Sequence, residues 1–288
     1  MPQPANWSPL IHAVDDNGLF MIWLYNLPTW LFALLTISGF VSLALVGLRL
    51  IHRRLNAGTL ATLIDNGTVG WFFSGVTVLY GLLLGLLTVA TWTNYTQATA
   101  LASQEAASLA VLYRDMAGYP LPERIQLQTQ LRTYTRFIIE QSWPLQRQGF
   151  IHDGESAELL NLQEPLMGFE PTTETGKILH QEAIRTFNSL VELRRLRAES
   201  ISGSVPGVIW YVVLLGALLT LIFGYLFVVK SFWFHGLLVS LLGAVIGLLI
   251  FLIAALDHPY WGEVSVSPQA YELVLSKVMS SAVNSPKK

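Results

Sequence analysis

Long apolar segments alternate along the chain with one long polar segment. Four segments are apolar over about 20 residues, the length that crosses a bilayer core at about 1.5 Å per residue. We predict membrane spans at these ranges: Thr29–Leu48, Val69–Trp92, Gly207–Val229 and Gly236–Leu256. None of the four contains Asp, Glu, Lys, Arg or His. The pattern therefore predicts an all-α integral membrane protein with four transmembrane helices.

The polar segment at 94–206 keeps apolar positions at helical spacing, which predicts helices rather than an irregular linker. One helix is expected to continue from the second span to about Ala117, and another to begin at Pro122. Two more are expected at Ser156–Gln163 and Thr173–Glu199. The helix after Pro122 should bury one face, formed by Leu127, Leu131, Tyr134, Ile138 and Gln141. The last helix should bury Leu179, Ile184, Phe187, Val191 and Leu196.

This pattern predicts a 2+2 layout of spans with a helical soluble insertion between spans two and three. The expected parts are an interfacial amino-terminal segment at 1–28, a transmembrane hairpin at 29–92, the soluble module at 93–206, a second hairpin at 207–256 and a carboxy-terminal tail at 257–288.

Short loops rich in Lys and Arg stay in the cytoplasm. Arg49, Arg53 and Arg54 lie between the first two spans, and Lys230 lies between the last two. We therefore expect both termini and the soluble module on the periplasmic side. The basic cluster Arg194–Arg197, close to the third span, is a signal in the opposite direction.

Composition agrees with a membrane protein and excludes several other classes. Hydrophobic residues make up 52% of the 288 residues and charged residues 12%, against about 25% charged in a typical soluble domain. The formal net charge of -2 argues against nucleic-acid binding. The absence of Cys excludes disulfides, thiolate metal sites and cysteine nucleophiles. No nucleotide-binding, serine-hydrolase or zinc-protease motif occurs, so we expect neither an enzyme nor a cofactor.

The second span carries a stripe of small and hydroxyl residues at steps of three and four: Ser74, Thr77, Gly81, Gly85, Thr88, Thr91 and Tyr95. Such a stripe could line a pore assembled from several subunits, because hydroxyls and exposed backbone replace part of an ion's hydration. It could equally be a seam on which another helix packs closely. Both interpretations stay open here. For the small residues of the third and fourth spans, including Gly216, Gly243 and Gly247, we expect packing.

Three further groups of polar residues have alternative interpretations. The cluster at 152–155 (His-Asp-Gly-Glu) could bind a cation or form a solvated turn. Asp257 and Glu263 follow the fourth span, where they could form a gate or ion mouth or mark the end of a helix. The basic run Arg194–Arg197 could dock acidic lipid or an acidic partner, or be a solvated helix end. The spans contain no ionisable residue, which favours a channel or a structural protein over a proton-coupled pump.

The order of several short motifs resembles one known family, the bacterial bestrophin-like domain family. These motifs are Gly81–Leu87 leading into Trp92–Tyr95, Glu105-Ala106, Leu121-Pro122, Tyr134 with Glu140–Pro144, Arg194–Arg197, Val205-Pro206 and Leu256–Gly262. Bestrophins are oligomeric, mostly anion-conducting channels whose second span lines the pore. The resemblance therefore implies that the second-span stripe lines a pore, and that Asp257 and Glu263 have a gate-linked role.

Two functions follow as hypotheses. The first is a homo-oligomeric ion channel of the bacterial inner membrane, whose partners are further copies of itself, membrane lipid and inorganic ions. The alternative is a non-conducting membrane scaffold or sensor whose helical module binds a partner. Bulky residues at Gly81 or Thr88 should block conduction in the first case and only loosen packing in the second.

Overall fold

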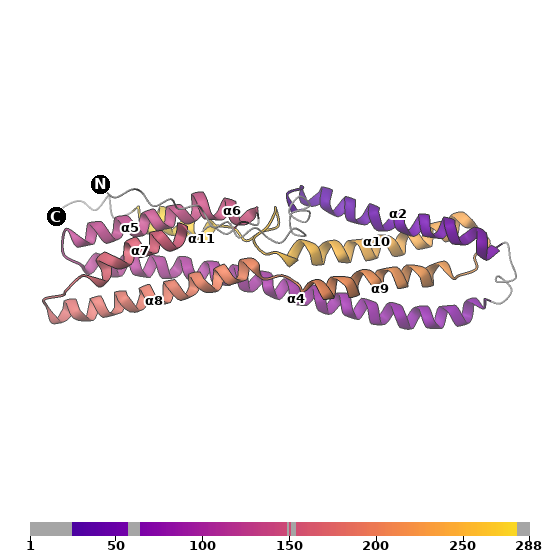
Figure 1. The fold of residues 1–288 in the computed structure, drawn as a ribbon, viewed down its shortest axis with the longest axis horizontal. Helices are drawn as coiled ribbons and strands as arrows, with labels where there is room; N and C mark the ends of the chain where they lie inside the picture. The colour runs from indigo at the N-terminus through magenta and orange to yellow at the C-terminus, as the bar shows by residue number, and fades with distance from the viewer. Residues whose placement is uncertain (1–24, 57–63, 149, 151–153, 281–288) are drawn as a thin grey trace, which may run out of the picture. The chain divides into compact units, whose positions relative to one another are not determined.

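The computed structural model describes residues 25–56, 64–148, 150 and 154–280, and this part of the chain is helical, with no strand (Figure 1). The helices are α2 (Thr29–Asn56), α4 (Asn66–Asp115), α5 (Glu123–Phe137), α6 (Trp143–Arg147), α7 (Gly154–Met167), α8 (Glu174–Ser202), α9 (Gly207–Tyr225), α10 (Phe232–Asp257) and α11 (Gln269–Leu273). A 3-10 turn at Met116–Gly118 ends α4, and π-helical turns occupy Ile138–Ser142 and Val274–Val278.

The chain forms two compact units. The apolar unit consists of Leu27–Tyr95 and Ser204–His258, and so contains α2, the first part of α4, α9 and α10. The polar unit contains the described residues of Thr96–Gly203 and of 259–280, together with Tyr25 and Asn26. The single helix α4 contributes residues to both units.

Four of these helices are long and apolar enough to cross a membrane. They contain the first, second and fourth predicted spans, whereas the third was predicted to extend to Val229 and its helix α9 ends at Tyr225. Large apolar side chains point outward from them, with Leu82 at 59% and Leu86 at 63% exposure. Trp71 and Trp92 are also exposed on α4 and lie about 31 Å apart along the helix, which matches a hydrocarbon core of about 30 Å. Trp residues favour the two membrane interfaces. The apolar unit therefore has the surface of a membrane protein.

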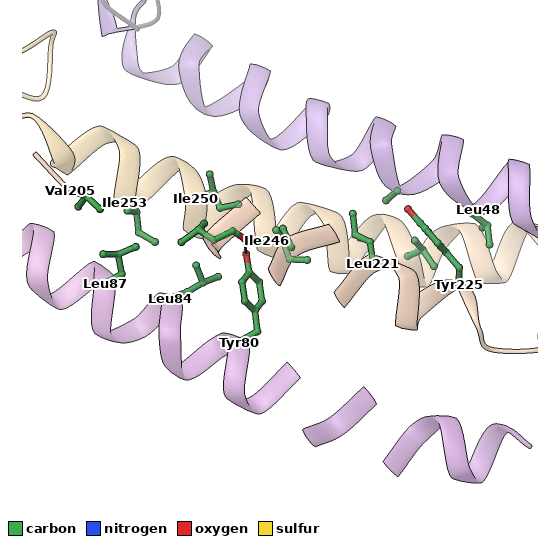
Figure 2. Packing of buried hydrophobic residues seen from close by; sticks show 14 residues of the cluster. Leu48, Tyr80, Leu84, Leu87, Val205, Leu221, Tyr225, Ile246, Ile250 and Ile253 are labelled. Atoms are coloured by element: carbon green, nitrogen blue, oxygen red, sulfur yellow. Dashed lines mark hydrogen bonds between the residues drawn. The ribbon is translucent and has the colours of Figure 1, made fainter. Parts of the chain in front are cut away.

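Buried apolar side chains from all four helices form the core of the apolar unit (Figure 2). Leu84 and Leu87 of α4 point toward Ile250 and Ile253 of α10. Tyr80 also points inward, and its hydroxyl donates a hydrogen bond to the carbonyl of Val213 in α9 at 3.0 Å. This bond satisfies a polar group that would be costly to leave unpaired in an apolar interior.

Small residues bring the helices of this unit into close contact. A Cβ atom on Gly243 would lie 3.0 Å from the carbonyl oxygen of Phe40, and one on Gly247 would lie 2.9 Å from the Cα of Ile37. A Cβ on Gly216 would lie 2.6 Å from the ring of Tyr80. The prediction that the small residues of the third and fourth spans serve packing is confirmed at these three glycines.

Gly247→Ala is expected to lower the free energy of unfolding by about 1–3 kcal/mol, because the added methyl group meets the backbone of α2. Gly39→Ala on α2 is the matched control, since nothing lies within 4 Å of its added Cβ. Denaturant titration of both purified variants in detergent measures the difference. Equal stability of the two variants would contradict the close approach of α2 and α10.

The polar unit confirms most of the predicted face of α5. Leu127, Leu131, Tyr134 and Ile138 have no exposed surface. Gln141 is exposed and Ser142 is buried instead, because the π-helical turn at Ile138–Ser142 adds a residue and shifts the buried face by one position. The predicted face of α8 was wrong in part, since Phe187 is buried but Leu179, Val191 and Leu196 are 37–39% exposed.

Candidate functional site

The exposed part of the predicted α4 stripe consists of Ser74, Gly81 and Gly85. No other part of the chain that the structure describes lies within 4 Å of a Cβ built on either glycine. Packing among the described residues therefore does not account for Gly81 and Gly85. The hydroxyl of Ser74 donates to the carbonyl of Gly70 at 2.8 Å, so it stays close to its own helix. At this end of the stripe, small side chains leave the helix backbone accessible from outside the chain.

The other end of the stripe turns inward. Thr91 has no exposed surface, and its hydroxyl donates to the carbonyls of Leu87 and Thr88 at 3.2 and 3.1 Å. Thr77, Thr88 and Tyr95 are half-buried. The stripe is thus not one continuous surface of the chain. The residues of the stripe recur every 3.5 residues on average, whereas a helix has about 3.6 residues per turn. Their positions therefore rotate by about 20° per heptad around a straight helix.

Asp257, predicted at a gate or ion mouth, ends α10 and binds the beginning of α9. Its Oδ1 accepts a hydrogen bond from the backbone N–H of Val205 at 2.6 Å, and its Oδ2 accepts one from the indole Nε1 of Trp210 at 3.3 Å. The side chain is buried. Both carboxylate oxygens are therefore used within the apolar unit, where they hold the end of one span to the start of another.

Asp257→Ala is expected to cost about 2–4 kcal/mol of unfolding free energy, because it leaves a buried N–H of Val205 and the indole N–H of Trp210 without an acceptor. Asp257→Asn should cost less, since its amide oxygen can keep one of the two bonds. Thermal unfolding of the purified protein compares the three. An alanine variant as stable as the wild type would exclude this structural role.

The second predicted gate residue, Glu263, is exposed and belongs to the polar unit. It follows Gly262, whose φ of +71° lies in the left-handed region. A side chain at position 262 would also meet the carbonyl oxygen of Tyr25. The guanidinium of Arg147 donates a hydrogen bond to the carbonyl of Gly262 at 3.2 Å. The backbone carbonyl of Arg147 accepts one from the N–H of Gly262, also at 3.2 Å. The loop after α10 therefore has a defined shape that requires glycine at this position.

Sequence reasoning missed a buried charge cluster in the polar unit, formed by Glu105, Glu155, Arg194 and Arg197. Arg197 of α8 donates from Nε to Glu105 of α4 and from Nη2 to Glu155 of α7, each at 2.6 Å. Arg197 and Glu105 have no exposed surface, and Glu155 is 3% exposed. Arg194 adds a second contact to Glu155 at 3.2 Å. The cluster joins α4, α7 and α8.

Two interpretations of the sequence are corrected by this cluster. Arg194–Arg197 is not an exposed docking surface, because Arg197 is fully buried and Arg194 is paired inside the unit; of the three arginines only Arg195 is largely exposed. Glu155 binds two arginine side chains rather than a metal cation, and His152 and Asp153 lie outside the described residues. Within the part of the chain that the structure describes, no group of three or more His, Cys, Asp or Glu could hold a metal.

A signal for this cluster was present in the sequence. The buried positions of α8 recur at steps of three and four, and Arg197 lies on the same face as Ala183, Phe187 and Leu190. A charged residue on an apolar helix face requires a buried partner. The sequence alone does not identify that partner, because Glu105 lies 92 residues away.

The pKa shifts of Glu155 on α7 and Arg197 on α8 indicate that both side chains are ionised. Burial alone would raise the pKa of Glu155, but the guanidinium groups of Arg197 and Arg194 outweigh it and hold the pKa below its ordinary value. Burial would lower the pKa of Arg197, yet Glu105 and Glu155 raise it well above its ordinary value. Both side chains therefore keep their charges near neutral pH.

These features define the class of the protein as a helical membrane protein with four candidate spans and a folded polar unit. Residues 38–271 match the family model of the Bestrophin-like domain. Since this match covers most of the chain, the protein belongs to that family, and the predicted resemblance is confirmed. The comparison with curated proteins gives no match.

Solved structures have the same fold at low sequence identity. Two variants of a bacterial bestrophin homologue from Klebsiella pneumoniae match with TM-scores of 0.57 and 0.58 and 12% identity. The matches cover 92% and 94% of this chain and 99% and 100% of those chains. A structure described as a membrane protein matches with a TM-score of 0.57 and 13% identity over 94% of this chain and 100% of that chain.

Proposed function

We propose that the protein is a homo-oligomeric ion channel of the bacterial inner membrane in which α4 lines the pore. The observation that carries the proposal is the open face at Gly81 and Gly85, where no other described part of the chain lies within 4 Å of an added Cβ. Gly39 and Gly75 are equally open, but Gly81 and Gly85 lie about one helical turn apart and share their face of α4 with exposed Ser74. Small residues and exposed backbone allow close approach by ions or by the same helix of another copy. Membership of the bestrophin-like family supports the same function.

The proposed pore surface is narrower than the predicted stripe. We assign Ser74, Gly81 and Gly85 to it, because they are exposed on α4. Half-buried Thr77, Thr88 and Tyr95 are proposed to flank it. Thr91 packs inside the apolar unit and is left out.

We propose that Asp257 influences opening by holding the ends of α9 and α10 together, because both of its oxygens accept hydrogen bonds from the chain. Glu263, which is exposed, is proposed to act at the mouth of the conduction path. The predicted spans carry no Asp, Glu, Lys, Arg or His, which supports a channel over an ion-coupled carrier. Preference for anions is proposed from the family relationship.

Currents across a planar bilayer test the proposal directly. Purified protein is expected to give discrete conductance steps in chloride salts, with a reversal potential that reports the sign of the permeant ion. Size-exclusion chromatography with light scattering should show a homo-oligomer in the same sample. A stable oligomer without current across several salts, voltages and pH values would exclude the channel and favour a membrane scaffold.

The proposed orientation places the polar unit and both termini in the periplasm, because the short loops near Arg49 and Lys230 are basic. The chain has no native Cys, so single cysteines report accessibility without a background. In intact cells, a membrane-impermeant maleimide is expected to label Glu192→Cys on α8 and to leave Lys230→Cys unlabelled until the membrane is opened. The reverse pattern would place the polar unit in the cytoplasm.

A further inference from the structure

The two carboxylates of the buried charge cluster are not equally compensated. Glu155 accepts from two guanidinium groups, Arg197 at 2.6 Å and Arg194 at 3.2 Å, and from the amide of Gln146 at 3.3 Å. Among the residues that the structure describes, Glu105 has Arg197 as its single cationic partner, at 2.6 Å, and accepts a longer bond from the hydroxyl of Tyr134 at 3.4 Å. A fully buried carboxylate with one cation is the weaker acid of the two, because desolvation disfavours its charged form.

The remaining groups that face Glu105 do not take up a proton in its place. Tyr134 of α5, Tyr271 of α11 and Tyr260 after α10 surround the cluster. Burial raises the pKa of all three phenols above their ordinary value, so they stay protonated. Arg197 and Glu155 keep their charges for the reasons given above. Glu105 is therefore the group in this cluster whose charge changes first as pH falls.

We propose that Glu105 is a proton-binding switch, and that its protonation loosens the contact between α4 and α8 at Arg197. The proton binds to a carboxylate oxygen of Glu105 and removes the ionic part of its bond to Arg197. Before this step the negative charges of two carboxylates equal the positive charges of two guanidinium groups. Afterwards one carboxylate faces two guanidinium groups in an interior that excludes water, and an unbalanced buried charge is unfavourable.

The remaining contacts of Arg197 determine which contact of α8 weakens. Arg197 still binds Glu155 of α7 and the amide oxygen of Gln146, the latter at 3.2 Å, so α8 stays attached to its other neighbours. The contact that weakens is the bond of Arg197 to Glu105 of α4. Thr186 of α8 keeps its hydrogen bonds with Asp115 and Ser108 of α4. Since α4 also carries the proposed pore surface, acid should then change conduction. That consequence alone rests on the proposed function, because the protonation and the loosening concern the polar unit itself.

Infrared difference spectroscopy tests the protonation in the intact protein in nanodiscs. Lowering the pH from about 8 to about 5 is expected to produce the high-frequency carbonyl band of a buried protonated carboxylic acid. Glu105→Gln should lack this band, whereas Glu199→Gln, which removes the exposed partner of Arg195, should keep it. Absence of the band in the wild type, or its persistence in Glu105→Gln, would overturn the proposal.

Hydrogen exchange of residues 99–115 tests the loosening. After correction for intrinsic rates, wild-type exchange is expected to be about tenfold faster at acidic pH, the effect of about 1.4 kcal/mol of lost local stability. Glu105→Gln should exchange at the faster rate at both pH values. A wild-type rate that does not change with pH would overturn the loosening. If Glu105→Gln does not fold, Glu105→Asp should shift the frequency of the band, and an unshifted band would overturn the assignment. Neither measurement depends on ion currents.

Discussion

Replacing Arg197 with Met is expected to lower the free energy of unfolding by about 3–5 kcal/mol, which is the cost of breaking a buried ion pair from one side. Methionine fills a similar volume but leaves Glu105 without its single cation and Glu155 with only Arg194. The loss should appear as a lower denaturant midpoint of the purified protein in detergent.

Arg195→Met is a matched control two residues away on the same helix. Its pair with Glu199 is exposed, with 76% and 59% of the two side chains accessible, so its loss should cost less than about 1 kcal/mol. Adding Glu105→Gln to Arg197→Met should recover part of the lost stability, because it removes the uncompensated carboxylate. Equal effects of Arg197→Met and Arg195→Met would show that the buried cluster does not stabilise the polar unit.

Leucine at position 81 is expected to reduce the current per oligomer to below about a tenth of wild type, because its side chain extends from a face that is now open. Single-channel recording of Gly81→Leu in planar bilayers measures this directly. If Gly81 instead packs against a neighbouring subunit, the same substitution should dissociate the oligomer. Light scattering of the same preparation distinguishes block from dissociation.

Gly75→Leu is the matched control on the same helix. Nothing lies within 4 Å of its added Cβ either, but it points about 120° away from Gly81 around α4. It should conduct like the wild type. Normal currents from Gly81→Leu would remove this face from the pore, and a block by both variants would show a general effect on α4.

Much of the fold was predictable because hydropathy and periodicity are local properties of the chain. Uninterrupted apolar segments predicted the four spans, and residues 127–138, in α5 and at the start of the π-helical turn, revealed their buried face through steps of three and four. The prediction failed one turn later, at Gln141, where a π-helical turn changed the period. No local feature of the sequence indicates that insertion, since it depends on how the helix meets its neighbours.

The candidate sites were less predictable because the role of each residue depends on which other parts of the chain lie next to it in the fold. Gly81 and Gly247 occupy similar small-residue stripes, yet Gly247 lies against the backbone of α2, whereas none of the other described elements lies against Gly81. Asp257 follows a span as predicted, but its bonds to Val205 and Trp210 became evident only in the fold.

The sequence by itself determined the helical membrane class, the four apolar segments and the family resemblance, because each depends on the order of residue types along the chain. Tertiary structure alone decided the position of the buried charges. Arg197 meets Glu105 across 92 residues of sequence, and Glu155 across 42. A buried guanidinium is stable only where carboxylates from other helices pair with it. The hydropathy pattern of one helix does not identify those partners.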